Sequence, residues 1–414
     1  MIAQAGKDHR GAHGCLPTAR QQLLVRAAAA PVAVARQAWQ TWREGTDLAA
    51  VDSASGRLLL WIYHRREELE LSAADAAALE PRYRQTWLRN QVLLNRCAEV
   101  VGHLQASGIE CLLLKGMALL TDVYADEGGR YLEDFDLLVR PEQVPRAVAA
   151  LNTLGWHAPH PEELSLEARH AHGFYNAEGL SCDLHWHLLW RAHAAVNEAP
   201  LWATKRPLRV RDEPTFTLAA EHLLLHLCVH GMAWETVPPI RWLLDVHLLL
   251  QRHPVQWELV LAEARRRGVT LPLAEALSVY ETVLPGELPT FLHEQLRLLP
   301  ASEEQRLAYA QLVTEPTLRA VLRGLMTDWK AAQRRGEVPV GCRSAVRFLC
   351  LRWRVPSAWA LPGQFVRRFR RRWRSVNFLR GERPIRNDIR WNGWRRTPRA
   401  GSLSLPRRRG EGWG

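Results

Sequence analysis

Leu113-Leu-Lys-Gly-Met-Ala-Leu119 and Glu133-Asp-Phe-Asp-Leu-Leu-Val139 are the two stretches that decide the fold. The first completes a short apolar run, Ile109 to Leu114, which glycines bound on both sides, and such a run is typical of a buried strand. The residues from Gly116 to Tyr124 then indicate a helix, and the second stretch indicates another strand. Strand, helix and strand in this order predict a small α/β unit.

The hydrophobic pattern becomes mainly helical on either side of this unit. The pattern predicts an amphipathic helix over 142–154 and a third strand from Leu180 to Leu188. The chain before residue 107 and the chain from about 217 to 335 carry leucines at helical spacing, with a cap at Ser72 and a helix stop at Gly108. We therefore predict an α+β fold with four regions: an N-terminal helical region (1–107), a small mixed α/β core (108–200), a C-terminal helical domain (201–340) and an Arg/Trp-rich basic tail (341–414), disordered after 380.

Three carboxylates fall on the predicted strands. Asp134 and Asp136 flank Phe135, so the two-residue period of a strand places both on one face. Asp183 lies in the next strand, and neighbouring strands would bring all three together. Clustered oxygen ligands suit Mg²⁺, and two such ions can activate an attacking oxygen and stabilise a leaving pyrophosphate.

Lys115 and Gly116 stand at the turn between the first strand and the following helix. Backbone N–H groups at a helix N-terminus can hold phosphate. Lys115 is one of four lysines in a chain that otherwise uses arginine, which favours a role for it at this turn.

The formal charge of +12 is concentrated in the tail. Residues 366–414 contain 16 arginines, no lysine and three acidic residues, so the rest of the chain is close to neutral. This distribution excludes a basic nucleic-acid binder as the description of the whole protein. The tail alternates arginine with tryptophan, a pattern that suits single-stranded nucleic acid, an anionic membrane surface or an acidic partner, and equally a solvated extension.

Other classes are excluded by simple counts. The first residues lack the apolar core of a secretory signal, and no run approaches the ~18 apolar residues of a membrane span. The seven cysteines are scattered and include no CxxC pair. We expect a reduced, cytoplasmic protein without a transmembrane segment.

The motifs together resemble the uncharacterised nucleotidyltransferase branch of the polymerase-β superfamily. The resemblance rests on 113–119, Tyr124, Arg130, 133–139, Asp183-Leu-His-Trp-His187, His230 and Arg241-Trp-Leu-Leu-Asp245, and covers roughly residues 95–265. It implies transfer of a nucleoside monophosphate from an NTP to an acceptor, with two Mg²⁺ ions on Asp134, Asp136 and Asp183. Asp183 would ligate one metal or act as base toward the acceptor.

The resemblance also implies a nucleotide-binding set. Gly116 matches the glycine of the phosphate-binding turn, and Lys115 and Arg130 match basic positions near the phosphates. His185 shares a face with Asp183 and would orient it or touch substrate. Relatives suggest an acceptor from natural-product, peptide or polysaccharide biosynthesis.

Met117 departs from the superfamily pattern. The position after the turn glycine usually carries serine or glycine, and the gap to the first carboxylate is longer here. Two alternatives therefore stay open: a catalytically degenerate module that binds nucleotide or peptide, and an RNA-modifying or RNA-binding protein that uses the tail.

His222, His226 and His230 recur at four-residue spacing on one predicted helix. The neighbouring leucines favour a half-buried polar seam over a zinc site, because no matching cysteine or carboxylate spacing accompanies them.

Overall fold

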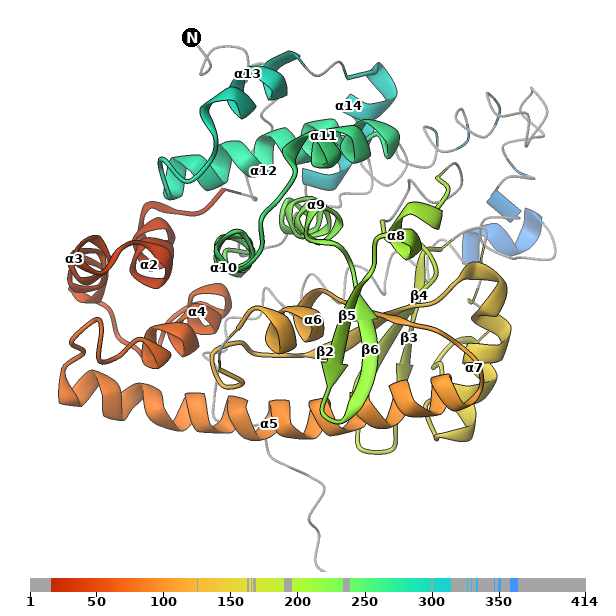
Figure 1. Ribbon diagram of the computed structural model, residues 1–414, viewed down its shortest axis with the longest axis horizontal. Helices are drawn as coiled ribbons and strands as arrows, with labels where there is room; N and C mark the ends of the chain where they lie inside the picture. The colour runs from red at the N-terminus through yellow and green to blue at the C-terminus, as the bar shows by residue number, and fades with distance from the viewer. Residues whose placement is uncertain are drawn as a thin grey trace, which may run out of the picture. The chain divides into compact units, whose positions relative to one another are not determined.

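A six-stranded mixed sheet forms the centre of the fold (Figure 1). In spatial order its strands are β3 (Ala171–Tyr175), β4 (Ser181–His185), β2 (Asp134–Leu138), β1 (Leu112–Leu114), β6 (Glu213–Thr217) and β5 (Arg206–Val210). β2 is parallel to β4 and antiparallel to β1, whereas β1 is parallel to β6. The outer strands β3 and β5 are antiparallel to their neighbours. The three predicted strands thus correspond to β4, β2 and β1, which are adjacent to one another inside the sheet.

The computed structural model describes residues 16–124, 126–161, 164, 166, 169–189, 196–233, 239–298 and 301–313, with short stretches between 326 and 363. The tail 366–414, and with it every expectation about RNA, membrane or acidic partners, lies outside the described residues.

Helices precede and follow the sheet, as the sequence predicts. The N-terminal set is α2 (Ala19–Ala29), α3 (Val32–Arg43), α4 (Ser53–His64) and α5 (Ala73–Ala106). Between the first and last strands lie α6 (Lys115–Asp122), the short 3-10 helix η1 (Pro141–Gln143), α7 (Val144–Thr153) and α8 (Ala199–Ala203). The set that follows the sheet is α9 (Ala220–Gly231), α10 (Arg241–Arg252), α11 (Trp257–Arg266), α12 (Thr270–Val283), α13 (Thr290–Leu298) and α14 (Glu303–Val313). The short 3-10 helix η4 (Ala358–Ala360) lies near the end of the described residues. The predicted fold class, a mixed α/β core between helical regions, is confirmed.

The 34-residue helix α5 supports one side of the sheet (Figure 1). The Ser72 side chain accepts a hydrogen bond from the backbone N–H of Asp75, 3.1 Å away, which confirms the predicted cap. The helix ends at Ala106, and Gly108 follows with φ +69°, a conformation that favours glycine. α5 packs against β2, β5, β6 and α7, so it holds the sheet in place along its length.

The two faces of β2 have different roles. Phe135 is fully buried and its ring meets Trp156 edge-on, with centroids 5.4 Å apart. Asp134 and Asp136 point the other way because successive strand residues alternate. Asp136 on that face contacts Lys115, the first residue of α6. The sequence pattern therefore orients the carboxylates correctly toward the side that α6 covers.

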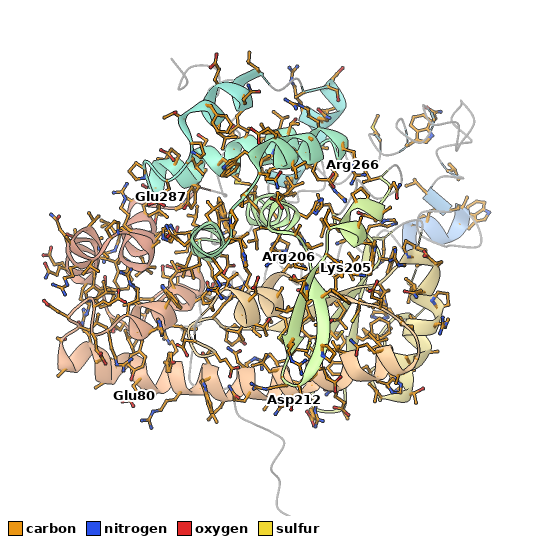
Figure 2. All side chains as sticks on the ribbon, viewed as in Figure 1. Glu80, Lys205, Arg206, Asp212, Arg266 and Glu287 are labelled. Atoms are coloured by element: carbon orange, nitrogen blue, oxygen red, sulfur yellow. The ribbon has the colours of Figure 1, made fainter. Side chains whose placement is uncertain are left out.

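The sheet extends past residue 200, where we had predicted the start of a helical domain. β5 and β6 form a hairpin around Asp212, and Figure 2 labels Arg206 at its start and Asp212 at its turn. The hairpin was missed because Pro207, Pro214 and several charged residues interrupt the apolar alternation that marks a strand. β3 was missed for a similar reason, since Ala171–Tyr175 contains a histidine and a glycine and lies at the sheet edge.

Within the described part of the chain, the helices are all too short or too polar to cross a bilayer.

Candidate metal and nucleotide site

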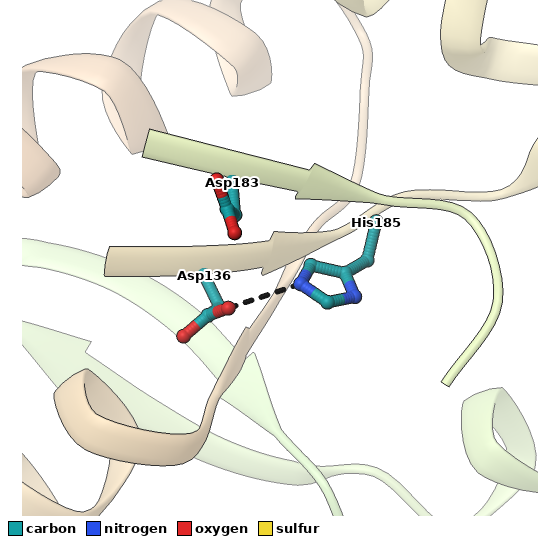
Figure 3. A group of neighbouring side chains, drawn as sticks. All are labelled: Asp136, Asp183 and His185. Atoms are coloured by element: carbon teal, nitrogen blue, oxygen red, sulfur yellow. Dashed lines mark hydrogen bonds and ion pairs between the residues drawn. The ribbon is translucent and has the colours of Figure 1, made fainter. Parts of the chain in front are cut away.

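Strand register brings two of the predicted carboxylates side by side. Asp136 on β2 pairs directly with Asp183 on β4, and His185 lies two residues further along β4 on the same face. One ligand atom from each of Asp136, Asp183 and His185 lies within 4.8 Å of the others (Figure 3). Asp134 pairs with Ser181 at the start of β2, outside this three-residue group.

Asp136 is the centre of the charge arrangement. Its Oδ1 accepts a hydrogen bond from Lys115 Nζ at 2.6 Å and lies 3.0 Å from His185 Nε2. Burial alone would raise the pKa of Asp136, but the attraction of Lys115 and the bond to His185 outweigh it and hold that pKa well below its usual range. Because the carboxylate is ionised, His185 Nε2 must donate the proton in this contact.

The other two carboxylates behave in the opposite way. Burial, followed by repulsion from Asp136 and Asp183, raises the pKa of Asp134 to about 7. Burial and repulsion from Asp136 also raise the pKa of Asp183. The folded protein therefore holds these negative charges less readily than water does, as carboxylates that lack a cation are expected to do.

The donor set fits a divalent cation. Two carboxylates offer the hard oxygen ligands that Mg²⁺ and Mn²⁺ prefer, and the third stands one pleat away on the same strand face. His185 Nδ1 is buried and has no hydrogen-bond partner among the described residues. The ring is therefore fixed by the contact of its Nε2 with Asp136 Oδ1. The sequence predicts His185 on the face of Asp183, and in the structure His185 is one of the three candidate ligands.

The Lys115–Gly116 turn lies next to the carboxylates, because Leu114 on β1 pairs with Asp136. A Cβ added at Gly116 would lie 2.6 Å from Arg130 Nη1 and 2.9 Å from Leu132 Cδ2, so glycine is required for this close approach. Met117 is fully buried in the core. The methionine at position 117, where the superfamily usually has serine or glycine, therefore packs in the core and does not face the surface of the turn.

Arg130 lies in a buried ion pair. Its Nε and Nη2 each lie 2.9 Å from an oxygen of Asp245 on α10, and both side chains are 4% exposed. The Tyr124 hydroxyl donates to the same carboxylate at 2.7 Å. The family resemblance implies a place near the phosphates for Arg130; in the structure Arg130 binds Asp245 on α10, and its Nη1 lies toward the Gly116 turn.

Two further arginines hold the segment that leads into β2, and sequence reasoning did not single them out. Arg241 on α10 donates to the Tyr131 carbonyl at 2.7 Å. Arg89 on α5 donates to the carbonyls of Leu132 and Glu133, both at 2.9 Å. Arginine bonds to backbone carbonyls leave no periodic trace in a sequence, although Arg241 belongs to one of the quoted family motifs. These contacts fix the entry to the strand that carries Asp134 and Asp136.

The histidine seam of α9 does not form a metal site among the described residues. His222 Nδ1 lies 3.3 Å from the Thr204 hydroxyl, and His226 is buried with its Nδ1 unpartnered in the described part of the chain. The His226 and His230 rings meet edge-on with centroids 6.3 Å apart. The structure supports the polar-seam interpretation.

Replacing His226 by glutamine is expected to flatten the pH dependence of stability. Burial, then the nearby charge of Lys115, lowers the pKa of His226 well below 6.5. At a pH between the lowered pKa of folded His226 and the unfolded value of 6.5, the unfolded chain binds a proton that the folded protein does not. The contribution of neutral His226 to the free energy of unfolding is therefore complete above pH 6.5 and is lost as the pH falls. This group contributes up to about 1.4 kcal/mol per pH unit. Urea unfolding at pH 7, 6 and 5 measures the effect, and equal slopes for both proteins would contradict a neutral His226.

Comparison with known proteins agrees with this geometry. A family model described as an uncharacterised nucleotidyltransferase matches residues 40–285, more than half of the chain. The chain belongs to this nucleotidyltransferase family. The match includes every strand of the sheet and α4 through α12, so the family region comprises the carboxylates, the Lys115–Gly116 turn and the Arg130–Asp245 pair. The resemblance drawn from the motifs is confirmed.

An antigenic nucleotidyltransferase-like protein from Paracoccidioides brasiliensis is 13% identical, covers 51% of this chain and 94% of its own, and has a TM-score of 0.34. No curated protein sequence matches the chain.

Proposed function

We propose that this family member transfers a nucleoside monophosphate from an NTP to an acceptor nucleophile and releases pyrophosphate. The observation that carries the proposal is the pairing of Asp136 with Asp183 beside the Lys115–Gly116 turn, in a chain of a nucleotidyltransferase family. Asp134, Asp136 and Asp183 would hold two Mg²⁺ ions, with His185 against Asp136. When bound, Mg²⁺ supplies charge neutralisation for the triphosphate and activation of the attacking oxygen.

The other parts of the reaction depend on residues of the chain. An acceptor oxygen or nitrogen forms a bond to the α-phosphorus while the bond to the pyrophosphate oxygen breaks. Asp183, which pairs with Asp136 across the two strands, would ligate one metal or take the acceptor's proton. Lys115 and the first N–H groups of α6 would hold the negative triphosphate. Catalysis would then consist mainly of positioning and charge neutralisation.

Retention of three repelling carboxylates argues against a module that merely binds a neutral partner. Without a cation, burial and then repulsion from Asp136 disfavour the ionised forms of Asp134 and Asp183 and raise the pKa of each. A bound cation removes that repulsion. This favours the enzyme over the degenerate binding module.

Thermal unfolding with each NTP, with and without Mg²⁺, tests the site. We expect stabilisation that requires both, with an increase in Tm of about 3 °C at a nucleotide concentration 100 times the Kd. Asp183→Asn should abolish the shift. Asp212→Asn, at the β5–β6 turn shown in Figure 2, makes the same chemical change away from the site and should leave the shift intact.

Pyrophosphate release separates transfer from binding. A panel of hydroxyl, phosphate and amine acceptors should include at least one that yields pyrophosphate with wild type and none with Asp183→Asn. A Mg²⁺-dependent thermal shift with no pyrophosphate from any acceptor would favour the binding module. No shift with any nucleotide would contradict the proposal.

A further inference from the structure

Lys115 occupies an unfavourable position for a lysine. Its φ of +41° is in the left-handed region, which costs a non-glycine residue of order 1–2 kcal/mol. It is also the first residue of α6, where the helix dipole disfavours a positive charge. Glycine would remove the strain, and an uncharged side chain would remove the dipole repulsion. The ammonium group itself must supply the compensation.

Asp136 supplies that compensation. Lys115 Nζ lies 2.6 Å from Asp136 Oδ1, and the side chains are 20% and 6% exposed. The same Oδ1 is also the atom that His185 Nε2 approaches at 3.0 Å. The ammonium is therefore bound to the carboxylate that lies at the middle of the candidate metal ligands.

The charges at the site do not balance without a further cation. Asp134, Asp136 and Asp183 together carry up to three negative charges, and Lys115, which contacts Asp136, brings one positive charge. A divalent ion that takes Asp136 Oδ1 must displace one of the two close neighbours of that oxygen, and the positive charge of Lys115 Nζ is the one that repels the ion. The displaced ammonium then needs a new anion, and a triphosphate at the α6 N-terminus provides one.

We propose that Lys115 is the resident cation of the metal-free site, and that it competes with the divalent metal for Asp136 until the phosphates of a nucleotide draw it away. Lys115 is thus a positioning residue that couples metal binding to nucleotide binding. By linkage, each ligand strengthens the other by the same factor, within the 5- to 150-fold range typical of such coupling. The inference rests on the proposed metal and nucleotide site and adds the coupling between its two ligands.

Manganese affinity without nucleotide tests the competition. We expect wild type to bind Mn²⁺ weakly and Lys115→Met to bind it at least tenfold more tightly, as measured by the loss of the free Mn²⁺ signal in electron paramagnetic resonance. Lys115→Arg retains the charge and should restore weak binding. Lys205→Met is the matched control, because Lys205 is equally exposed at 21% and pairs with Glu110 instead of the carboxylate group (Figure 2). It should bind Mn²⁺ as wild type does.

The outcomes separate the competition from the site itself. Equal Mn²⁺ affinity of wild type and Lys115→Met, both lost on Asp136→Asn, would overturn the role of Lys115 and leave the metal site standing. Mn²⁺ binding to Lys115→Met that survives Asp136→Asn would overturn both. Lys115→Asn is the second variant if the methionine protein does not fold, because asparagine tolerates the left-handed conformation better than most residues. It should bind Mn²⁺ as tightly as Lys115→Met is expected to.

Discussion

Asp136→Asn is expected to lower the free energy of unfolding by about 3 kcal/mol and to abolish Mg²⁺-dependent nucleotide binding. The stability loss follows because the change leaves the Lys115 ammonium largely buried without its anion, and breaking one side of a buried pair typically costs 3–5 kcal/mol. The binding loss follows because Asp136 lies at the centre of the candidate metal ligands. Urea unfolding and the NTP thermal shift measure the two effects separately.

Asp134→Asn is the matched comparison, two residues away on the same face of β2. Its pKa is raised to about 7, above the unfolded value of 3.8, so ionised Asp134 destabilises the fold once the pH exceeds 3.8. Removing the charge should stabilise the metal-free protein at pH 8 by on the order of 1 kcal/mol after solvent screening. Nucleotide binding with Mg²⁺ should still be lost.

The contrast between these two aspartates is diagnostic. If both variants destabilise the protein equally, Lys115 does not distinguish Asp136 from Asp134, and the charge arrangement described above is wrong. If Asp136→Asn keeps full Mg²⁺-dependent nucleotide binding, the assignment of the metal site is wrong.

The sequence predicted the parts of the site that depend on strand period. Alternation alone placed Asp134 and Asp136 on one face of β2, opposite the buried Phe135, and the register of β2 with β4 then brought Asp183 beside Asp136. The same alternation put His185 on the Asp183 face, where it contacts Asp136. These positions follow from backbone geometry, which a local pattern records.

Other features depend on contacts between distant segments, and no local pattern records those. The partner of Arg130 is Asp245, 115 residues later, so its carboxylate could not be assigned from the residues near the turn. The β5–β6 hairpin joins β1 across about 100 residues and carries prolines that conceal it. Lys115 was placed at the turn, but its contact with Asp136 depends on the pairing of β1 with β2.

Arg130→Met is expected to destabilise the protein by about 3–5 kcal/mol, the largest single loss we predict. Both oxygens of Asp245 would lose their bonds to the guanidinium in a place that is 4% exposed, and the Tyr124 hydroxyl would be the remaining bond to that carboxylate among those described above. Tyr124→Phe removes that single hydrogen bond and should cost about 1 kcal/mol. Urea unfolding of wild type, Arg130→Met and Tyr124→Phe measures the three free energies of unfolding, which should fall in the order wild type, Tyr124→Phe, Arg130→Met.

The double variant Arg130→Met/Asp245→Leu separates a structural role from a nucleotide-binding one. Replacing both charges by apolar groups should restore most of the lost stability, because no buried charge is left unpaired. We expect nucleotide affinity in the presence of Mg²⁺ to stay about tenfold weaker, since Arg130 Nη1 faces the Gly116 turn and a charge-assisted hydrogen bond is worth about 1.5–3 kcal/mol. Tyr124→Phe retains Arg130 and should bind nucleotide as wild type does. Wild-type affinity in the stabilised double variant would instead assign Arg130 to the fold alone, as the clamp between the β2 entry and α10.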